Sequence, residues 1–434
     1  MPITLAEKAV KMKRNYFIVS LIFLVFFVIS FLTNILGPLI PDIINSYRLS
    51  FTMVALLPFA FFIAYGVMSI PSGMLLEKFR EKPVMTAAFL VAFAGALMFA
   101  LKPVYSVAVI SLFMLGAGMA TLQVAINPLL RAAGGEEHFA FNSVMAQLVF
   151  GLASFLSPFV YSYMVRELAL PAAQTNGLVG LLATLVPPEL PWTSLYWVIA
   201  LVTLIMVVVM LFSPFPKVVR KEDERSGAWA THVALFKQKT VLLYFLGIFA
   251  YVGTEQGIAN WMSKFLQLYH GLDPQTIGAS SVAWFWGLMT AGCLLGLLLL
   301  KLFDSRRVLI GFALLAIVLL SVALFGPAVA ARYAFPLLGF GISVMWSIVF
   351  SLALNSVSEH HGSFSGILCS GIVGGAIMPL VVGRLGDWFG LRIGMMFLYI
   401  TLAYILSIGF WARPLVLNQT IQRTRKQPDV DHRS

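Results

Sequence analysis

The sequence predicts an all-α polytopic membrane protein with twelve transmembrane helices in two six-helix bundles. The composition is the first indication. Of all residues, 60% are hydrophobic and only 11% are charged, and the mean hydropathy is +0.92, whereas a soluble domain carries about 25% charged residues. The second indication is a series of long apolar runs. The third is a charged segment, 215–240, that divides this series into two equal parts.

An apolar run of about 20 residues is long enough for a helix to cross a hydrocarbon layer about 30 Å thick. Several of the runs contain Gly or Pro, which spanning helices tolerate. The predicted spans, with boundaries good to a few residues, are 16–41, 52–76, 84–101, 105–130, 140–165, 193–214, 241–268, 275–300, 308–326, 330–356, 364–386 and 391–412.

Lys and Arg are distributed unequally between the two faces that this topology defines. Of the 29 basic residues, 22 fall in tails and connections on the face that carries both termini, and 7 fall on the opposite face. Because cytoplasmic connections are enriched in Lys and Arg, both termini are predicted to be cytoplasmic, in a bacterial-type inner membrane. The asymmetry accounts for the net charge of +11, so this charge does not indicate nucleic-acid binding.

The predicted organisation has four parts. A six-helix bundle at 1–214 is followed by a cytoplasmic linker loop at 215–240, a second six-helix bundle at 241–412 and a cytoplasmic tail at 413–434. Carriers built from two such halves bind their substrate near the bilayer midplane, between the halves.

A short internal similarity supports a duplication. GAGMATLQ (116–123) in the fourth span and GFGISVMW (339–346) in the tenth begin with the same Gly-x-Gly. The match places Gln123 and Trp346 at corresponding positions, in spans that are six apart, as a duplication requires. Chance similarity is the alternative.

Glu255 is the acidic residue that lies deep inside an apolar run. The other seventeen acidic residues fall in loops, tails or the ends of runs. Fourteen residues from Val241 place Glu255 roughly 21 Å into the hydrocarbon layer. An ionisable group at that depth costs a few kcal/mol unless it faces a polar cavity or takes up a proton or a cation. We therefore predict a coupling role, with a structural Glu bonded to a neighbouring helix as the alternative.

Uncharged polar residues at mid-span depth are the predicted substrate-binding groups. Asn34 precedes Gly37 and Pro38, which would loosen the first span, and Gln123 and Asn127 share one helix face because they are four residues apart. Amides offer donors and acceptors without charge, which suits a polyhydroxylated neutral solute, and an indole offers a stacking surface. Helix–helix hydrogen bonds are the alternative for each amide. The predicted set is Asn34, Gln123, Asn127, Gln147, Gln256, Asn260 and Trp346.

Four motifs resemble the fucose/glucose/galactose:cation symporter family of the major facilitator superfamily. LQVAINPLL (122–130) is similar to L-E/Q-T-A-x-N-P-F, and YVGTEQG (251–257) is similar to Y-V-G-A-E. SVMWSIVFSLA (343–353) resembles S-I-M-F-P-T-I-F-S-L-A, and SGILCSGIVGGAIMP (365–379) resembles S-G-I-L-x-x-A-I-V-G-G-A-I-x-P. The resemblance implies the major facilitator fold and sugar transport coupled to a cation.

A loop after the second span also resembles that superfamily. In GMLLEKFREKP (73–83), Gly73 would allow close helix contact, and Glu77 with Arg80 would form an ion pair at a gate. A solvated charged turn is the alternative.

Two acids of the family are absent. TNILGP (33–38) has Asn34 where the family has an acid, and Gln123 stands where fucose-type members have Glu, although glucose-type members carry Gln. Proton coupling through those two acids is therefore not expected, and Glu255 is left as the single carboxylate for coupling.

The sequence thus predicts a monomeric secondary transporter in the lipid bilayer that imports a hexose-like sugar by H⁺ or Na⁺ symport with alternating access. Glu255 would carry the proton or help to hold Na⁺, and no cofactor is predicted. An enzyme is not predicted, because the chain has no nucleophile elbow, phosphate loop or metal-ligand cluster. The alternatives are a proton-coupled exporter of amphipathic compounds, a uniporter, and a sugar-binding membrane sensor that does not transport.

Overall fold

Among the residues that the computed structural model describes, twelve helical segments are long and apolar enough to cross a membrane. The structure describes residues 15–134, 139–169, 177–215, 229–357 and 361–415, so most of both tails and of the charged central linker lie outside the described residues. The twelve predicted spans are confirmed. The largest change at a single boundary is in the first span, which continues to Tyr47 rather than ending at 41.

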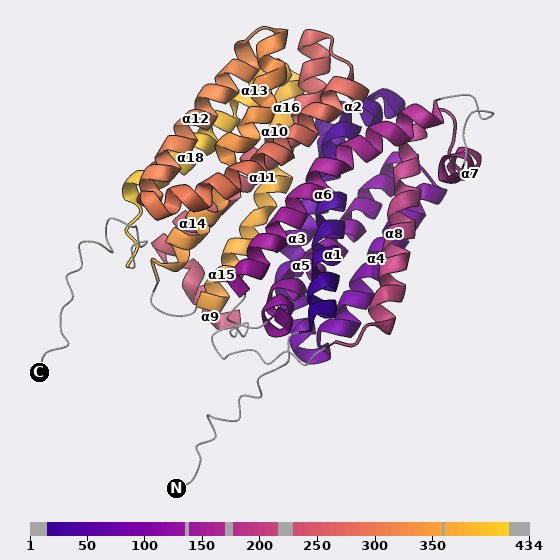
Figure 1. Ribbon diagram of the computed structural model, residues 1–434. Helices are drawn as coiled ribbons and strands as arrows, with labels where there is room; N and C mark the ends of the chain where they lie inside the picture. Colours follow the sequence, from indigo (N-terminus) through magenta and orange to yellow (C-terminus); the bar gives the residue numbers. More distant parts are fainter. Residues whose placement is uncertain (1–14, 135–138, 170–176, 216–228, 358–360, 416–434) are drawn as a thin grey trace, which may run out of the picture.

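The first six spans begin and end as follows (Figure 1). The first consists of α1 (Tyr16–Thr33) and α2 (Leu36–Tyr47), and the next four are α3 (Phe51–Phe79), α4 (Glu81–Leu101), α5 (Tyr105–Gly134) and α6 (Phe139–Leu168). A short helix, α7 (Gly177–Leu185), and a 3-10 turn, η3 (Pro191–Thr193), precede the sixth span, α8 (Ser194–Phe212).

The second six spans follow α9 (Trp229–Phe236), a short helix inside the segment that the sequence predicted as a linker loop. They are α10 (Lys239–His270), a π-helical turn η5 (Pro274–Gly278) with α11 (Ala279–Leu302), α12 (Ser305–Phe325), α13 (Ala328–Ile342) with α14 (Met345–Leu354), α15 (His361–Ser370) with η6 (Gly371–Val373) and α16 (Gly374–Phe389), and α17 (Leu391–Met396) with α18 (Leu398–Trp411).

The first span is broken where the sequence predicts loosening. The helix stops after Thr33 and restarts at Leu36. Pro38 has no N–H to donate to the carbonyl of Asn34, and its ring crowds that carbonyl, so a continuous helix is disfavoured there. The tenth span is also interrupted, between Ile342 and Met345.

The internal duplication is visible as one helix contact that occurs twice. A Cβ added to Gly116 would lie 2.1 Å from the carbonyl oxygen of Phe61, and one added to Gly339 would lie 2.0 Å from that of Phe285. Only glycine allows backbones to approach this closely. Because Gly116 and Gly339 are the first residues of the two similar segments, the repeated contact supports the similarity found in the sequence.

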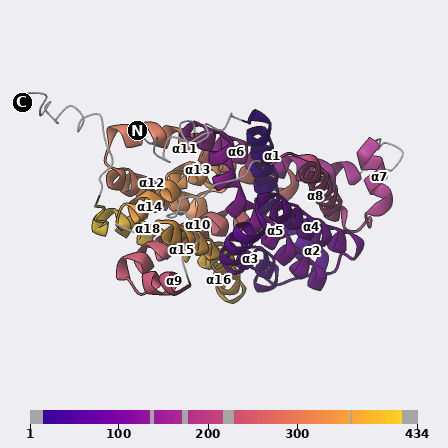
Figure 2. The same cartoon turned by 90° about the horizontal axis from the view of Figure 1, so that it is seen from below.

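α1 begins and α18 ends at the same end of the bundle, which we call the terminal end (Figure 1). We call the opposite end, where α2 and α16 finish, the distal end. α1–α8 pack mainly among themselves, as do α10–α18, and the most extensive contacts between the two groups are those of α3 with α16, α6 with α11, and α2 with α10. Figure 2 shows α16 beside α3 and α11 beside α6, with the two groups on either side.

Candidate functional site

Glu255 lies at the middle of the longest helix. It is the seventeenth of the 32 residues of α10, about 24 Å along the helix axis from Lys239 at 1.5 Å per residue. Its side chain is half-buried. A carboxylate at this depth needs polar company, a proton or a cation, so its neighbours define the candidate site.

The next residues on α10 supply that company. Gln256, only 3% exposed, donates a hydrogen bond from Nε2 to Oε1 of Glu255 at 3.1 Å. Asn260, 2% exposed, donates from Nδ2 to the backbone oxygen of Gln256 at 2.8 Å. Asn260 thus braces the residue that contacts the carboxylate. The three residues form one hydrogen-bonded row at the predicted position.

Glycines bring neighbouring helices against this row. A Cβ on Gly374 of α16 would lie 2.0 Å from the carbonyl oxygen of Phe249 on α10. A Cβ on Gly375 would lie 3.1 Å from both Gln256 Cγ and a ring carbon of Phe62 on α3. Gln256 therefore lies at the place where α3, α10 and α16 meet.

Asn34 occupies the break in the first span. It is 4% exposed and donates from Nδ2 to Oγ of Ser154 on α6 at 2.8 Å. Its Oδ1 is buried without a hydrogen-bond partner among the described residues. A buried acceptor without a partner costs about 1–3 kcal/mol, so this oxygen is suited to accept a hydroxyl hydrogen or to contact a cation.

Asn34 and the row on α10 lie at the same level of the bundle. A Cβ on Gly37 of α2 would lie 2.3 Å from the carbonyl oxygen of Ala259, so α2 and α10 touch there. Both helices run from the terminal toward the distal end. Asn34 and Gln256 each lie three residues before this contact, about 4.5 Å toward the terminal end.

Trp346 borders the same region from α14. Its ring is half-buried, lies 6.0 Å from that of Tyr251 and stacks on Phe350 at 5.7 Å. Tyr251 lies one helical turn before Glu255 on α10, and Cys293 of α11 lies near the same carboxylate. The four-residue spacing between Tyr251 and Glu255 could have identified Tyr251 as a neighbour of the carboxylate from the sequence. No feature of the sequence pointed to Ser154 or Cys293.

The remaining predicted binding residues form no hydrogen bonds among the described side chains. Gln123 on α5 is half-buried and Gln147 on α6 is exposed, and neither side chain forms a hydrogen bond with a described residue. Asn127 lies on α5, one turn after Gln123, but its side chain is outside the described part of the chain. Their role in binding stays a prediction.

Only some of the residues of the predicted gate loop have described side chains. Gly73 is buried within α3, and Arg80 is exposed between α3 and α4 with a φ of 67°. The side chain of Glu77 is not among those described. The proposed ion pair between Glu77 and Arg80 therefore stays a prediction as well.

Two carboxylates that the sequence did not single out close the distal end across the two groups of helices. Asp42 on α2 accepts hydrogen bonds from Tyr161 of α6 and from Gln275 of η5. Asp387 on α16 accepts from the backbone N–H groups of Phe51 and Thr52, at 2.7 and 2.8 Å. Each carboxylate thus joins spans from both groups.

The arrangement suits binding of a neutral polar solute together with a small cation. In the stretches that the structure describes, no three His, Cys, Asp or Glu side chains gather as a metal site. A Na⁺ ion at Glu255 would consequently rely on amide and backbone oxygens, which hard cations accept.

Comparison with known proteins is consistent with these features. A sequence profile described as Major Facilitator Superfamily matches residues 22–372. The chain is 30% identical over 407 residues to the "Glucose/galactose transporter" of Brucella abortus biovar 1 (strain 9-941), which covers 92% of this chain and 94% of that protein. It is 24% identical over 407 residues to the "L-fucose-proton symporter" of Escherichia coli (strain K12), with coverage of 88% and 90%.

Solved structures share the fold. A crystal structure of the E. coli fucose:proton symporter aligns with a TM-score of 0.65 at 20% identity, over 91% of this chain and 98% of that chain. A bacterial homologue of the human lysosomal transporter Spinster aligns with a TM-score of 0.74 at 13% identity, over 92% and 96%. At these identities the likeness concerns the fold alone.

Proposed function

The chain belongs to the Major Facilitator Superfamily, and we propose that it imports a hexose-like sugar by cation symport with alternating access. The observation that carries the proposal is that Asn34 and the Glu255–Gln256–Asn260 row lie at the same mid-depth level, beside the contact of α2 with α10. The relatives named as a glucose/galactose transporter and an L-fucose-proton symporter support the choice of a hexose.

The polar groups match the chemistry of a sugar. A sugar hydroxyl both donates and accepts, and each amide offers both functions without charge. The unpaired Oδ1 of Asn34 accepts a hydroxyl hydrogen, and the Gln123 amide is free of hydrogen bonds to described residues. The ring of Trp346 supplies an aromatic face at the same site. An exporter of amphipathic compounds would instead be served by an apolar cavity.

Glu255 is the proposed coupling group. Gln256 donates to one of its oxygens, and no described Lys or Arg forms an ion pair with it. A proton taken up by the carboxylate would remove the cost of a charge in the low-dielectric interior. We propose H⁺ as the coupling ion, supported by the relative named as a proton symporter, and Na⁺ is the alternative that the experiment distinguishes.

Alternating access requires the two groups of helices to move as units. We propose that these units are 1–214 and 241–412, joined by the linker 215–240, in a monomer of an inner membrane with cytoplasmic termini. The contacts of Asp42 and Asp387 close the distal end in this conformation. Breaking them would open the site toward the side from which the sugar enters.

The test is uptake of labelled glucose, galactose, fucose and mannose into proteoliposomes under imposed proton or Na⁺ gradients. Wild type is compared with Glu255→Gln. Glu189→Gln serves as a matched control, because Glu189 is exposed in the loop before η3. We expect one sugar to accumulate against its gradient with the proton gradient only. The Glu255→Gln variant should equilibrate this sugar without concentrating it, and the control should behave as wild type.

Other outcomes separate the rivals. Accumulation driven only by Na⁺ would change the coupling ion and retain the symport. Equilibration by the wild type without any gradient dependence would indicate a uniporter. Sugar binding without entry would indicate a sensor. If none of the sugars binds or enters, the hexose assignment fails, and efflux of apolar cations becomes the next measurement.

A further inference from the structure

Two apolar grooves open on the outer surface of the helix bundle near its terminal end. The first, of about 320 Å³, lies among α3, α4 and α5. The second, of about 370 Å³, lies among α11, α12 and α13. None of the residues that line them belongs to the site around Glu255.

The two grooves are built from equivalent residues. Seven positions that line the first groove have a lining counterpart 224 residues later in the second, including Phe79 with Phe303, Val84 with Val308 and Ala87 with Gly311. Phe61 and Phe285, whose carbonyl groups make the repeated contacts, are also 224 residues apart. Each half of the duplicated fold therefore forms the same groove.

The helix arrangement explains why the grooves are open. α3 and α4 both pack along α5 but make few contacts with each other, and α11 and α12 have the same relation to α13. Each groove is thus a gap between two walls over a helical floor. Gly311 lies at its edge, where an added Cβ would meet nothing within 4 Å. The open space lacks a protein occupant among the described residues.

The exposed surface of the grooves requires an apolar ligand. Phe79 and Phe303 are 49% and 51% exposed at the ends of two spanning segments, and Leu315 is 37% exposed within a third. Exposed aromatic and aliphatic side chains on the outer surface of such segments favour hydrocarbon over water. An acyl chain has the shape and the chemistry to fill such a gap.

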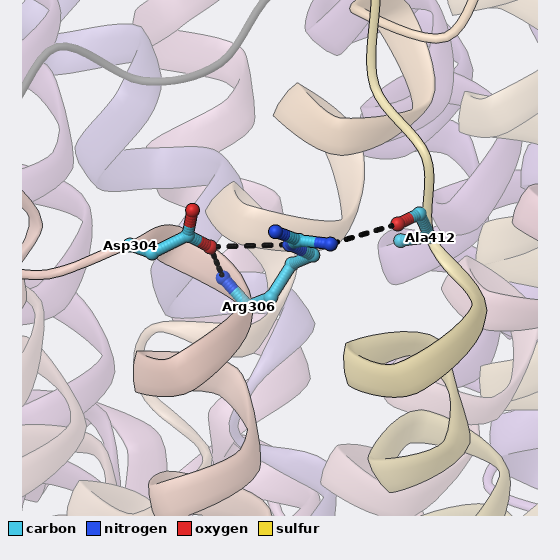
Figure 3. Close-up of polar contacts among 3 residues, drawn as sticks. All are labelled: Asp304, Arg306 and Ala412. Atoms are coloured by element: carbon cyan, nitrogen blue, oxygen red, sulfur yellow. Dashed lines mark hydrogen bonds and ion pairs between the residues drawn. The ribbon is translucent and has the colours of Figure 1, made fainter.

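A cation with no acidic partner among the described side chains stands at each groove. The Lys78 ammonium lies 5.2 Å from the centroid of the Phe79 ring that lines the first groove. Arg307 lines the second groove, is exposed, and has no side-chain hydrogen bond or ion pair with a described residue. Its neighbour Arg306 is already engaged with Asp304 at 3.2 Å and with the Ala412 carbonyl at 3.4 Å (Figure 3). A guanidinium in this position is suited to a phosphate group.

We propose that each groove binds one acyl chain of a phospholipid from the leaflet at the terminal end, and that Arg307 holds the phosphate of an anionic phospholipid at the second groove. The site is independent of the transported solute. Because α3–α4 and α11–α12 flank the grooves, the bound lipids would fill gaps that the helices leave open.

The experiment is native mass spectrometry of the whole protein, purified in a mild detergent and titrated with phosphatidylglycerol or phosphatidylcholine. Ala87→Leu and Gly311→Leu fill the two grooves at equivalent positions, singly and together. Val318→Leu is the matched control, because Val318 is 58% exposed on α12 and does not line the groove. Arg307→Gln removes the charge at the second groove. Thermal unfolding of every variant establishes that it is folded.

We expect wild type and the Val318→Leu control to retain two phospholipids each. Each single groove-filling variant should retain one, and the double variant should retain neither. Arg307→Gln should lower the preference for phosphatidylglycerol over phosphatidylcholine about tenfold, the effect of one charge-assisted hydrogen bond. Equal numbers of bound lipids in wild type and in the folded double variant would overturn the proposal. An unchanged lipid preference in Arg307→Gln would overturn the role of that residue.

Discussion

The carboxylate of Asp387 caps a helix that belongs to the other half of the chain, through Thr52. Oδ2 of Asp387 accepts from the backbone N–H of Thr52 at 2.8 Å and from its hydroxyl, and Oδ1 accepts from the N–H of Phe51 at 2.7 Å. Ser50 accepts from the next N–H, that of Met53, at 3.2 Å. The backbone N–H groups in the first turn of α3 thus find acceptors partly on the residue that precedes the helix and partly on a residue from the opposite half of the chain.

Asp387→Asn should shift the protein toward states that are open at the distal end. The amide cannot accept both N–H bonds as the carboxylate does, and it loses the attraction to the helix N-terminus. Loss of a helix N-cap lowers stability by about 0.5–2 kcal/mol. Because Asp387 is exposed to solvent, we expect a value in the lower part of that range. We expect an increase of about two- to fivefold in the distal-open population. Pulsed electron resonance between spin labels at Asn45 and Leu268, in a background without Cys293 and Cys369, measures it.

Asp304→Asn is the matched control for this variant. Asp304 also caps the first turn of a helix, since its Oδ1 accepts from the backbone N–H of Arg306 on α12 at 2.9 Å, but both residues belong to the same half and lie at the terminal end. Its substitution should alter local order there without moving the spin-label distance. Equal shifts in the two variants would mean that Asp387 does not act between the halves.

Gly37→Ala should prevent full closure of the distal end. The added Cβ would lie 2.3 Å from the carbonyl oxygen of Ala259, which backbone atoms cannot accommodate without separating α2 from α10. Overpacking of this kind costs about 1–3 kcal/mol, so transport of the proposed sugar should fall about tenfold or more. Proteoliposome uptake and the Tm of the purified protein are the measurements.

Gly311→Ala is the control for Gly37→Ala, since a Cβ there meets open space. It should leave uptake unchanged. Wild-type uptake by the Gly37→Ala variant would show that the close approach of α2 and α10 is not needed in the transport cycle.

Asn34→Ala should weaken sugar binding about tenfold, the effect of one lost hydrogen bond to a buried group. The variant removes the acceptor Oδ1 and also the bond from Nδ2 to Ser154. Isothermal titration with the transported sugar measures the change. Asn355→Ala is the control, because Asn355 follows α14 near the terminal end. The prediction fails if both variants bind the sugar as wild type does.

Trp346→Leu should weaken sugar binding several-fold, while Trp346→Phe should retain most of it. An aromatic contact contributes about 0.5–1.5 kcal/mol beyond its buried area, and Phe preserves an aromatic face beside Tyr251. Trp284→Leu is the control, because Trp284 is 51% exposed and packs on Phe155. Competitive binding assays compare the three variants. Equal affinities of Trp346→Leu and Trp346→Phe would exclude stacking.

Features that depend on local sequence were predicted. The twelve spans follow from the length and polarity of each run, and the break of the first span follows from Pro38. The central position of Glu255 could be counted along its own helix. The α9 helix was not expected, because its eight residues, although mostly apolar, are far too few to cross a membrane and lie in a segment predicted as a loop.

Features that depend on pairing between distant segments were not predicted. Asp42 and Asp387 looked like ordinary residues at the ends of apolar runs, and only their partners on other helices give them a role. Asn34 was a candidate from its depth, but the partner of its Nδ2 and the unpaired state of its Oδ1 depend on where α6 lies.

The sequence by itself determined which segments cross the membrane and which polar groups lie at mid-depth, because hydrophobic length and the 1.5 Å helical rise act along the chain. The tertiary structure alone decided which of these groups face one another and which end of the bundle is closed. Those relations depend on backbone approach at glycines such as Gly37 and Gly374 and on hydrogen bonds between residues far apart in the chain, and no local pattern encodes them.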